Sequence, residues 1–221
     1  MAQQVTNKYS QKQAHVLEGT LASAGYQVYD YVLALQPHED LCTTILEARR
    51  RFATAYACAE PATLTPRVTL VRFKQHALME PHITRRLRGI AAAIDTFRVE
   101  LNNFGSLPSH TIYFAVTSKV QIMNAVKALR AAQKLMKLDD DNKPHFLTAP
   151  YITLAQQLLP WQFEKGWAEY QQQTFHARFI ADQVLLLKRP SGGRYTLVER
   201  RGKGGMGEVW LAHDNELGAL R

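Results

Sequence analysis

Residues 65–73 read TPRVTLVRF and residues 149–158 read APYITLAQQL, and these two stretches decide the fold. Both contain the pattern Pro-x-[Val/Ile]-Thr-Leu, which places Thr69 and Thr153 in equivalent positions. The alternation of apolar and polar residues in each stretch is typical of a β-strand. Each strand is preceded by a helical pattern and a loop, and is followed by a helix and a strand. The repeat therefore predicts an internal duplication.

The pattern of apolar residues predicts the elements around the two stretches. In the first half we expect strands over 26–35, 67–73, 97–101 and 110–116, and helices over 39–58 and 80–94. In the second half we expect helices over 120–135 and 161–171, and strands over 150–155, 175–188 and 194–200, the last two joined by a Pro-Ser-Gly-Gly turn. Hairpins and helices both connect the strands. The predicted fold class is α+β: a bilobal, internally duplicated protein with two mostly antiparallel sheets and flanking helices around a central cleft.

The domain organisation follows from the same patterns. Residues 1–24 are polar with little periodicity and are predicted to form a flexible N-terminal arm. We expect residues 25–200 to form one domain of two lobes, approximately 25–115 and 116–200. Residues 201–221 are rich in glycine and are predicted to form a tail.

Composition narrows the class of protein. The 221 residues have a formal net charge of +8, and 46% of them are apolar. This excludes a disordered chain, and the lack of an apolar run of roughly 18 residues excludes a membrane-spanning helix. The N-terminal residues lack the apolar core of a signal peptide, so we expect a cytoplasmic protein. The positive charge indicates a phosphate-bearing partner or a solvated basic surface, and charge alone leaves both open.

The cysteines and histidines do not predict a metal centre or a disulfide. Cys42 and Cys58 fall on one predicted helix, where sixteen residues at about 1.5 Å each separate them by roughly 24 Å. A disulfide requires Cα atoms within about 7 Å, so we expect two free thiols. The chain also lacks the Cys and His spacings of a zinc site.

The repeated stretches resemble the 2′-5′ RNA ligase family of the two-histidine (2H) phosphoesterases. FRVELNNFGSLPSHTIYFAV at 97–116 and FIADQVLLLKRPSGGRYTLVER at 179–200 add to the resemblance, which covers about residues 25–200. In that family each lobe supplies a His-x-Thr motif, with one histidine as general base, the other as general acid, and both threonines bonded to a phosphate. The resemblance implies chemistry without metal or cofactor on RNA or a nucleotide with a 2′,3′-cyclic phosphate or a 2′-5′ linkage, and no membrane partner.

Thr69 and Thr153 match the family threonines, whereas Arg67 and Tyr151 stand where the family has its histidines. Arginine stays protonated and tyrosine titrates near about 10, so neither replaces an imidazole in proton transfer at neutral pH. All four side chains are instead suited to bind a phosphate and a base. We therefore expect a catalytically impaired relative that binds an RNA or nucleotide phosphate in the inter-lobe cleft.

The alternative is an active 2′,3′-cyclic phosphodiesterase or 2′-5′ RNA ligase that uses non-motif residues. His110, at the start of a predicted strand, and His145, shortly before Tyr151, are the candidate substitutes for the missing histidines. Whether any catalysis remains depends on whether either imidazole reaches the phosphate.

Four other features are interpreted as structural. His82-Ile83-Thr84 has the spacing of the family motif but lies on a predicted helix. Arg49 to Arg51 are expected on an exposed helix face, and Asp139 to Asp141 in a solvated loop. Trp161 and Trp167 are expected in the core of a lobe.

The C-terminal stretch GGRYTLVERRGKGGMGEVWLAHD resembles the opening of a bacterial Ser/Thr protein kinase. Gly202, Gly204, Gly207 and Val209 fit the glycine-rich loop that covers nucleotide phosphates. The sequence reaches Arg221 without a catalytic-loop or metal-binding Asp. We therefore expect no kinase activity from these residues, and a tail rather than a nucleotide site.

Overall fold

The computed structural model describes residues 25–58, 65–190, 196–201 and 208–212. Residues 1–24, predicted as an arm, lie outside the described residues. The strands are β1 (Val28–Leu35), β2 (Val68–His76), β3 (Phe97–Leu107), β4 (Thr111–Val116), β5 (His145–Phe146), β6 (Tyr151–Gln156), β7 (His176–Ala181), β8 (Gln183–Pro190), β9 (Thr196–Arg201) and β10 (Glu208–Ala212). The helices are α2 (Glu39–Tyr56), α3 (Glu80–Ala91), α4 (Lys119–Leu129), α5 (Gln133–Met136) and α6 (Pro160–Tyr170), with 3₁₀ turns at Ala77–Met79 and Arg130–Ala132.

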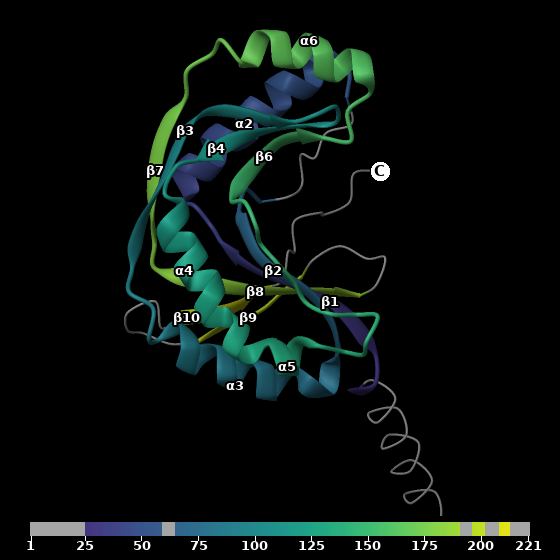
Figure 1. Cartoon of the computed structure of the whole chain (residues 1–221), viewed down its shortest axis with the longest axis vertical. Helices are drawn as coiled ribbons and strands as arrows, with labels where there is room; N and C mark the ends of the chain where they lie inside the picture. The colour runs from purple at the N-terminus through teal and green to yellow at the C-terminus, as the bar shows by residue number, and fades with distance from the viewer. Residues whose placement is uncertain (1–24, 59–64, 191–195, 202–207, 213–221) are drawn as a thin grey trace, which may run out of the picture.

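The strands form two sheets, as the sequence predicts. The first sheet has the order β10-β9-β8-β1-β2-β5, and the second has the order β6-β4-β3-β7. All pairs are antiparallel except β10 with β8, which run parallel. In Figure 1 the second sheet lies in the upper part of the view and the first in the lower part. The α+β class with two mostly antiparallel sheets is confirmed.

The two halves of the chain exchange strands between the sheets. The first half supplies β1 and β2 to the first sheet, but its last two strands, β3 and β4, pair with each other in the second sheet. The second half supplies β6 and β7 to the second sheet, but its strands β5 and β8 pair with β2 and β1 of the first sheet. Each sheet therefore contains strands from both sides of the boundary predicted near residue 115. The boundary separates the two halves of the sequence repeat, and the division into lobes stays a prediction.

The strand predicted over 175–188 is in fact two strands. Its first part, β7, pairs with β3 in the second sheet, and its second part, β8, pairs with β1 in the first sheet. The chain crosses between the sheets at Asp182. The prediction missed this because Val184 to Leu187 form a continuous apolar run, which is buried on both faces of β8 and conceals the change of partner.

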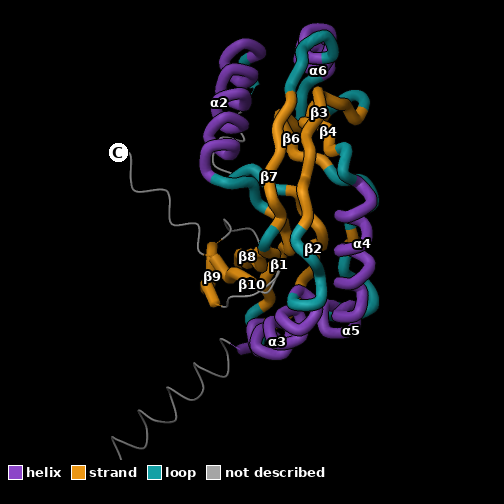
Figure 2. Tube along the Cα trace, turned by 90° about the vertical axis from the view of Figure 1, so that its left-hand side faces the viewer, coloured by secondary structure: helices purple, strands orange, loops and turns teal. Residues whose placement is uncertain are grey.

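Helices cover one face of each sheet. Helix α2 contacts β6, and α6 contacts α2 and β4, whereas α4 and α5 contact β2 of the first sheet. Figure 2 shows α2 on one side of the strands and α4 on the other, with α3 and α5 at the base. Gly166 lets α6 approach α2, because a Cβ atom there would lie 2.7 Å from the Phe52 ring. One hydrophobic core joins these helices to both sheets.

The opposite face of the first sheet carries a second, smaller cluster. Tyr31, Leu33 and Leu35 of β1 point into the main core, whereas Val32 and Ala34 alternate with them. Val32 and Ala34 are buried with Leu185 and Leu187 of β8 in a cluster of their own. The first sheet therefore has two distinct faces, each with a buried cluster of its own.

Two other expectations are resolved by the fold. Cys42 is buried in α2, Cys58 lies beyond the end of that helix, and both are free thiols, as predicted. The expectation that Trp161 is core was wrong, because its side chain is 44% exposed at the start of α6 with the Lys165 ammonium 5.8 Å from its ring centre. Trp167 packs partly buried against the main core.

The C-terminal segment continues the first sheet. Strand β9 pairs with β8, which confirms the strand predicted over 194–200. Residues 208–212 form β10, which pairs with both β8 and β9, so part of the predicted tail belongs to this sheet. Gly202, Gly204 and Gly207 lie outside the described residues, and Val209 pairs with Val184 in the parallel ladder.

Candidate functional site

The two threonine strands contain the same backbone irregularity. Ala34 pairs with Thr69 and Leu33 pairs with Val71, which leaves Leu70 as an extra residue in β2. In β6, Tyr113 pairs with Thr153 and Ile112 pairs with Ala155, which leaves Leu154 as the extra residue. A β-bulge thus follows each threonine directly. Both leucines are fully buried and both threonines are half-buried, so the duplication extends to the shape of the site.

Strands β2 and β6 contact each other where the two sheets meet (Figure 1). Arg49 of α2 lies at this junction with only 4% of its surface exposed. Its Nε and one terminal nitrogen donate hydrogen bonds of 2.9 and 2.8 Å to the carbonyl oxygen of Thr153. The arginine thus donates two hydrogen bonds from α2 to the backbone of the strand that carries Thr153.

Arg49 is also electrostatically coupled to the first motif. Burial, and secondly the positive charge of Arg67, lower its pKa to about 10. A guanidinium with this pKa is still charged at neutral pH, so two arginine charges lie close together beside the threonine strands. Two positive charges this close together, of which the Arg49 charge is buried, favour the binding of an anion nearby.

Arg49 corrects one sequence expectation. Arg50 and Arg51 are exposed as predicted, but Arg49 is buried. The signal was present in the sequence, since Ile45, Arg49 and Phe52 follow one another at helical spacing and therefore share the apolar face of α2. A charged residue on such a stripe is a candidate for a buried polar role.

The second motif is aromatic. Tyr151 is half-buried, and its ring centre lies 4.8 Å from that of Tyr113 at an angle of 34°. Tyr113 pairs with Thr153 on one side and with Gly105 on the other, and residues paired across strands share a face. A Cβ atom at Gly105 would lie 2.5 Å from the Tyr113 ring, so glycine makes room for this tyrosine. The sequence did not single out Tyr113, which becomes a candidate only once the strand register is known.

The structure places the two candidate histidines differently. His110 is exposed in the turn before β4, where its carbonyl accepts a hydrogen bond from the Leu158 N–H, beyond the end of β6. His145 is exposed on β5 and pairs with Arg72. Arg72 and Thr69 pair with Val32 and Ala34, which share one face of β1. We call this face, with Thr69, Arg72 and His145, the threonine face of the first sheet.

The remaining candidates keep structural roles. His82 is exposed on α3, as expected for a chance match to the motif. The side-chain amide of Asn142 and the backbone N–H groups of Asn142 and Asp141 donate hydrogen bonds to Asp139 within an exposed turn, and these bonds lower its pKa. In the part of the chain that the structure describes, no group of three or more His, Cys, Asp or Glu side chains is placed to hold a metal ion.

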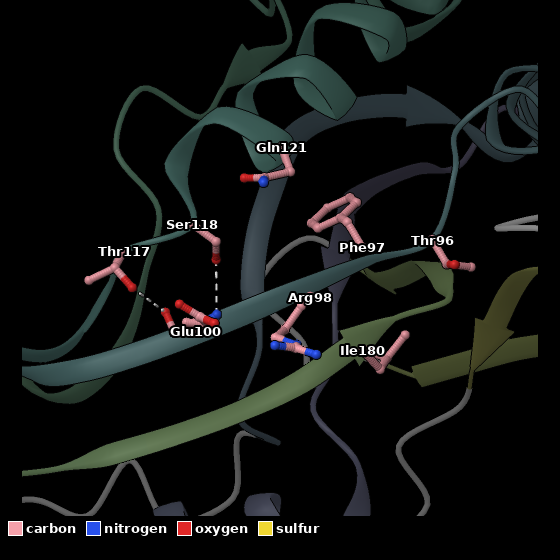
Figure 3. A pocket seen from close by; sticks show the side chains of 8 residues that line it. All are labelled: Thr96, Phe97, Arg98, Glu100, Thr117, Ser118, Gln121 and Ile180. Atoms are coloured by element: carbon pink, nitrogen blue, oxygen red, sulfur yellow. Dashed lines mark hydrogen bonds between the residues drawn. The ribbon is translucent and has the colours of Figure 1, made fainter.

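A cavity of about 580 Å³ lies away from the motif residues (Figure 3). It is lined from β3, β7 and the start of α4, and none of the four motif side chains borders it. The Ser118 hydroxyl accepts a hydrogen bond from the Glu100 N–H, and the Thr117 hydroxyl donates one to the Glu100 carbonyl (Figure 3). These two hydrogen bonds hold the start of α4 against β3, and these polar groups of the lining thus serve the local structure.

Comparisons with known proteins agree with this geometry. The family model of the 2′-5′ RNA ligase superfamily matches residues 37–193. The crystal structure of the protein TT0787 from Thermus thermophilus is similar with a TM-score of 0.56 and 16% sequence identity, covering 82% of this chain and 97% of that one. A search of curated proteins found no match. Among the described helices, none is both long and apolar enough to cross a membrane.

Proposed function

Because the chain belongs to the 2′-5′ RNA ligase superfamily, we propose that it binds the phosphate of an RNA end or a nucleotide between β2 and β6, with little or no turnover. The observation that carries this proposal is the pair of equivalent bulged threonine strands, joined at their junction by the buried Arg49. The reducing cytoplasm that the sequence predicts remains the expected location.

The binding half of the proposal rests on the chemistry of the four motif side chains. A guanidinium donates hydrogen bonds in a planar fork that matches phosphate oxygens, and Arg67 lies directly before β2. The hydroxyls of Thr69 and Thr153 are further donors from the two sides. The Tyr151 ring, supported by Tyr113, offers a flat surface on which a base can stack. The preferred ligand is a 2′,3′-cyclic or terminal phosphate, or a 2′-5′ linkage.

The loss of turnover rests on the same positions. A positioned acid or base contributes about 10²–10⁴-fold in rate, and an arginine and a tyrosine stand at the two positions where the family has its histidines. With both histidines of the motif replaced, substrate binding and electrostatic stabilisation remain. The protein then holds the ligand of an enzyme without completing its reaction.

One observation favours a second candidate function, an active phosphodiesterase or RNA ligase. His145 lies on the threonine face of the first sheet, in register with Arg72. An imidazole there is on the same side of the sheet as the Thr69 hydroxyl. His110, in contrast, lies in the turn before β4, and its backbone contacts Leu158, which follows the end of β6. Under this alternative His145 supplies the acid or the base.

Binding of a nucleotide with a terminal phosphate tests the first proposal. Arg67→Ala is expected to weaken binding of uridine 3′-phosphate about tenfold or more, because a charge-assisted contact of roughly 1.5–3 kcal/mol is lost. Isothermal titration measures the effect at fixed salt. The matched control is Arg86→Ala, which removes the same charge from an exposed position on α3. Equal affinities for the Arg67 variant and the wild type would place any ligand elsewhere.

A further inference from the structure

A second cavity, of about 260 Å³, borders the threonine face of the first sheet. Arg72 and Lys74 of β2 line it, together with Arg189 of β8 and Lys143 from the loop before β5. These four cations come from three separate parts of the chain. None of them belongs to either threonine motif.

The charges in this cavity are only partly compensated. Asp30 forms an ion pair with Arg189, with 3.2 Å between its Oδ2 atom and the arginine Nε. Asp141 brings a second carboxylate to the lining, so four cations face two anions. Within the described part of the chain, no hydrogen bond or ion pair engages the side chain of Arg72, Lys74 or Lys143. Several uncompensated cations in one hollow create a positive potential that attracts an anion.

The register of β1 fixes where these cations lie relative to the motif. Thr69, Arg72 and Lys74 pair with Ala34, Val32 and Asp30 in turn. These partners are successive residues on one face of β1, two positions apart. At about 3.3 Å per residue, Arg72 is about 7 Å and Lys74 about 13 Å along the strand from Thr69. Cations at such intervals along one line suit the repeating phosphates of an extended single strand.

We propose that this cavity, the basic subsite, binds the sugar-phosphate backbone of single-stranded RNA one to two nucleotides away from the phosphate held at Thr69 and Thr153. The inference rests on the proposed function, because the motif phosphate fixes one end of the strand. Lys74 and Lys143 act as mobile point charges on the backbone, and Arg72 adds a planar fork. Phosphate contacts of this kind carry no base specificity, so the subsite selects by length of the strand.

The test compares ligands of different length. The probes are uridine 3′-phosphate and a fluorescent six-nucleotide oligouridylate with a 3′-phosphate. The wild type is expected to bind the oligonucleotide more tightly, and Lys74→Ala/Lys143→Ala to lose this gain while keeping the mononucleotide affinity. Two lost phosphate contacts lower the salt slope by about 1.4, which corresponds to roughly 25-fold between 0.1 and 1 M salt. Both lysines are exposed, so the double variant should fold normally, which a thermal melt checks.

The control is Lys127→Ala/Lys134→Ala, which removes two exposed lysines from α4 and α5 and should leave the length dependence unchanged. Retention of the gain with length by the Lys74/Lys143 variant would overturn the inference, as would wild-type protein that binds both probes equally. If the Lys74/Lys143 variant lost as much affinity for a polyglutamate peptide as for the oligonucleotide, the cavity would be assigned to acidic proteins. This outcome would also overturn the inference. Length-dependent binding that Arg67→Ala leaves intact would defeat the proposed function but support the basic subsite. Binding of neither probe by the wild type would defeat both.

Discussion

The strand that carries Thr69 begins after Arg67 and continues past Arg72 and Lys74, whereas the strand that carries Thr153 begins with Tyr151 and pairs with Tyr113. Both strands have a bulge at the residue after the threonine. The backbone of the duplicated unit is thus the same on the two sides, and the side chains around it differ in kind. One side offers positive charge and the other offers flat rings.

This difference teaches how a symmetric site can bind an asymmetric ligand. A nucleotide has a charged phosphate at one end and a stacking base at the other. Under the proposed function, the side with Arg67 binds the phosphate and the side with Tyr151 stacks on the base. Two equivalent histidines would instead suit a reaction that passes a proton across a near-symmetric phosphodiester. Under the proposed function, Arg67 and Tyr151 serve binding at the two positions where the family has its histidines.

The largest expected effect comes from making the two sides alike. Arg67→His together with Tyr151→His should raise hydrolysis of a 2′,3′-cyclic nucleotide by more than the product of the single changes, because acid and base act in one transition state. The expected gain is at least about 10²-fold, with a bell-shaped pH profile around the imidazole pKa near about 6.5. The rate of product formation, measured by chromatography, gives this gain.

A fast wild-type enzyme would break the comparison. A turnover of about 1–10³ per second in the unmodified protein, abolished by His145→Gln, would establish the second candidate function. In that case the first side would carry an imidazole as well as positive charge. The same His145→Gln variant in a slow wild type should change nothing.

The next effect concerns Arg49, which lies at the junction of the two threonine strands. Arg49→Ala leaves a desolvated Thr153 carbonyl and a void at the junction, and should lower the free energy of unfolding by about 2–4 kcal/mol. Urea denaturation measures this change. Arg50→Ala, on the exposed face of the same helix, should stay within about 0.5 kcal/mol of the wild type. If the two variants proved equally stable, Arg49 would not join the motifs energetically.

The sequence carries the local features of this site but not its long-range ones. The threonine positions and most helices and strands were predictable, because each depends on the period of apolar residues in a short window. The exchange of strands between the sheets, β3 and β4 from the first half and β5 and β8 from the second, was not predictable, since strand partners are decided by contacts far apart in the chain. Tyr113 was missed for the same reason: its neighbour Thr153 is set by register. The burial of Arg49 lay within reach, because its place on the apolar stripe of α2 is visible in the sequence.

The smallest expected effect separates the two properties of the tyrosine on the second side. Tyr151→Phe keeps the ring that packs against Tyr113 and removes only the phenolic hydroxyl. If this side binds through stacking, oligonucleotide affinity should change less than about fivefold, since stacking contributes roughly 1–3 kcal/mol per base whereas one neutral hydrogen bond contributes roughly 1 kcal/mol or less. Fluorescence anisotropy with the six-nucleotide probe measures both this variant and Tyr151→Ala, which should lose the stacking energy. Equal losses in the two variants would show that the hydroxyl carries the contact, and the second side would then resemble the first in binding through polar groups.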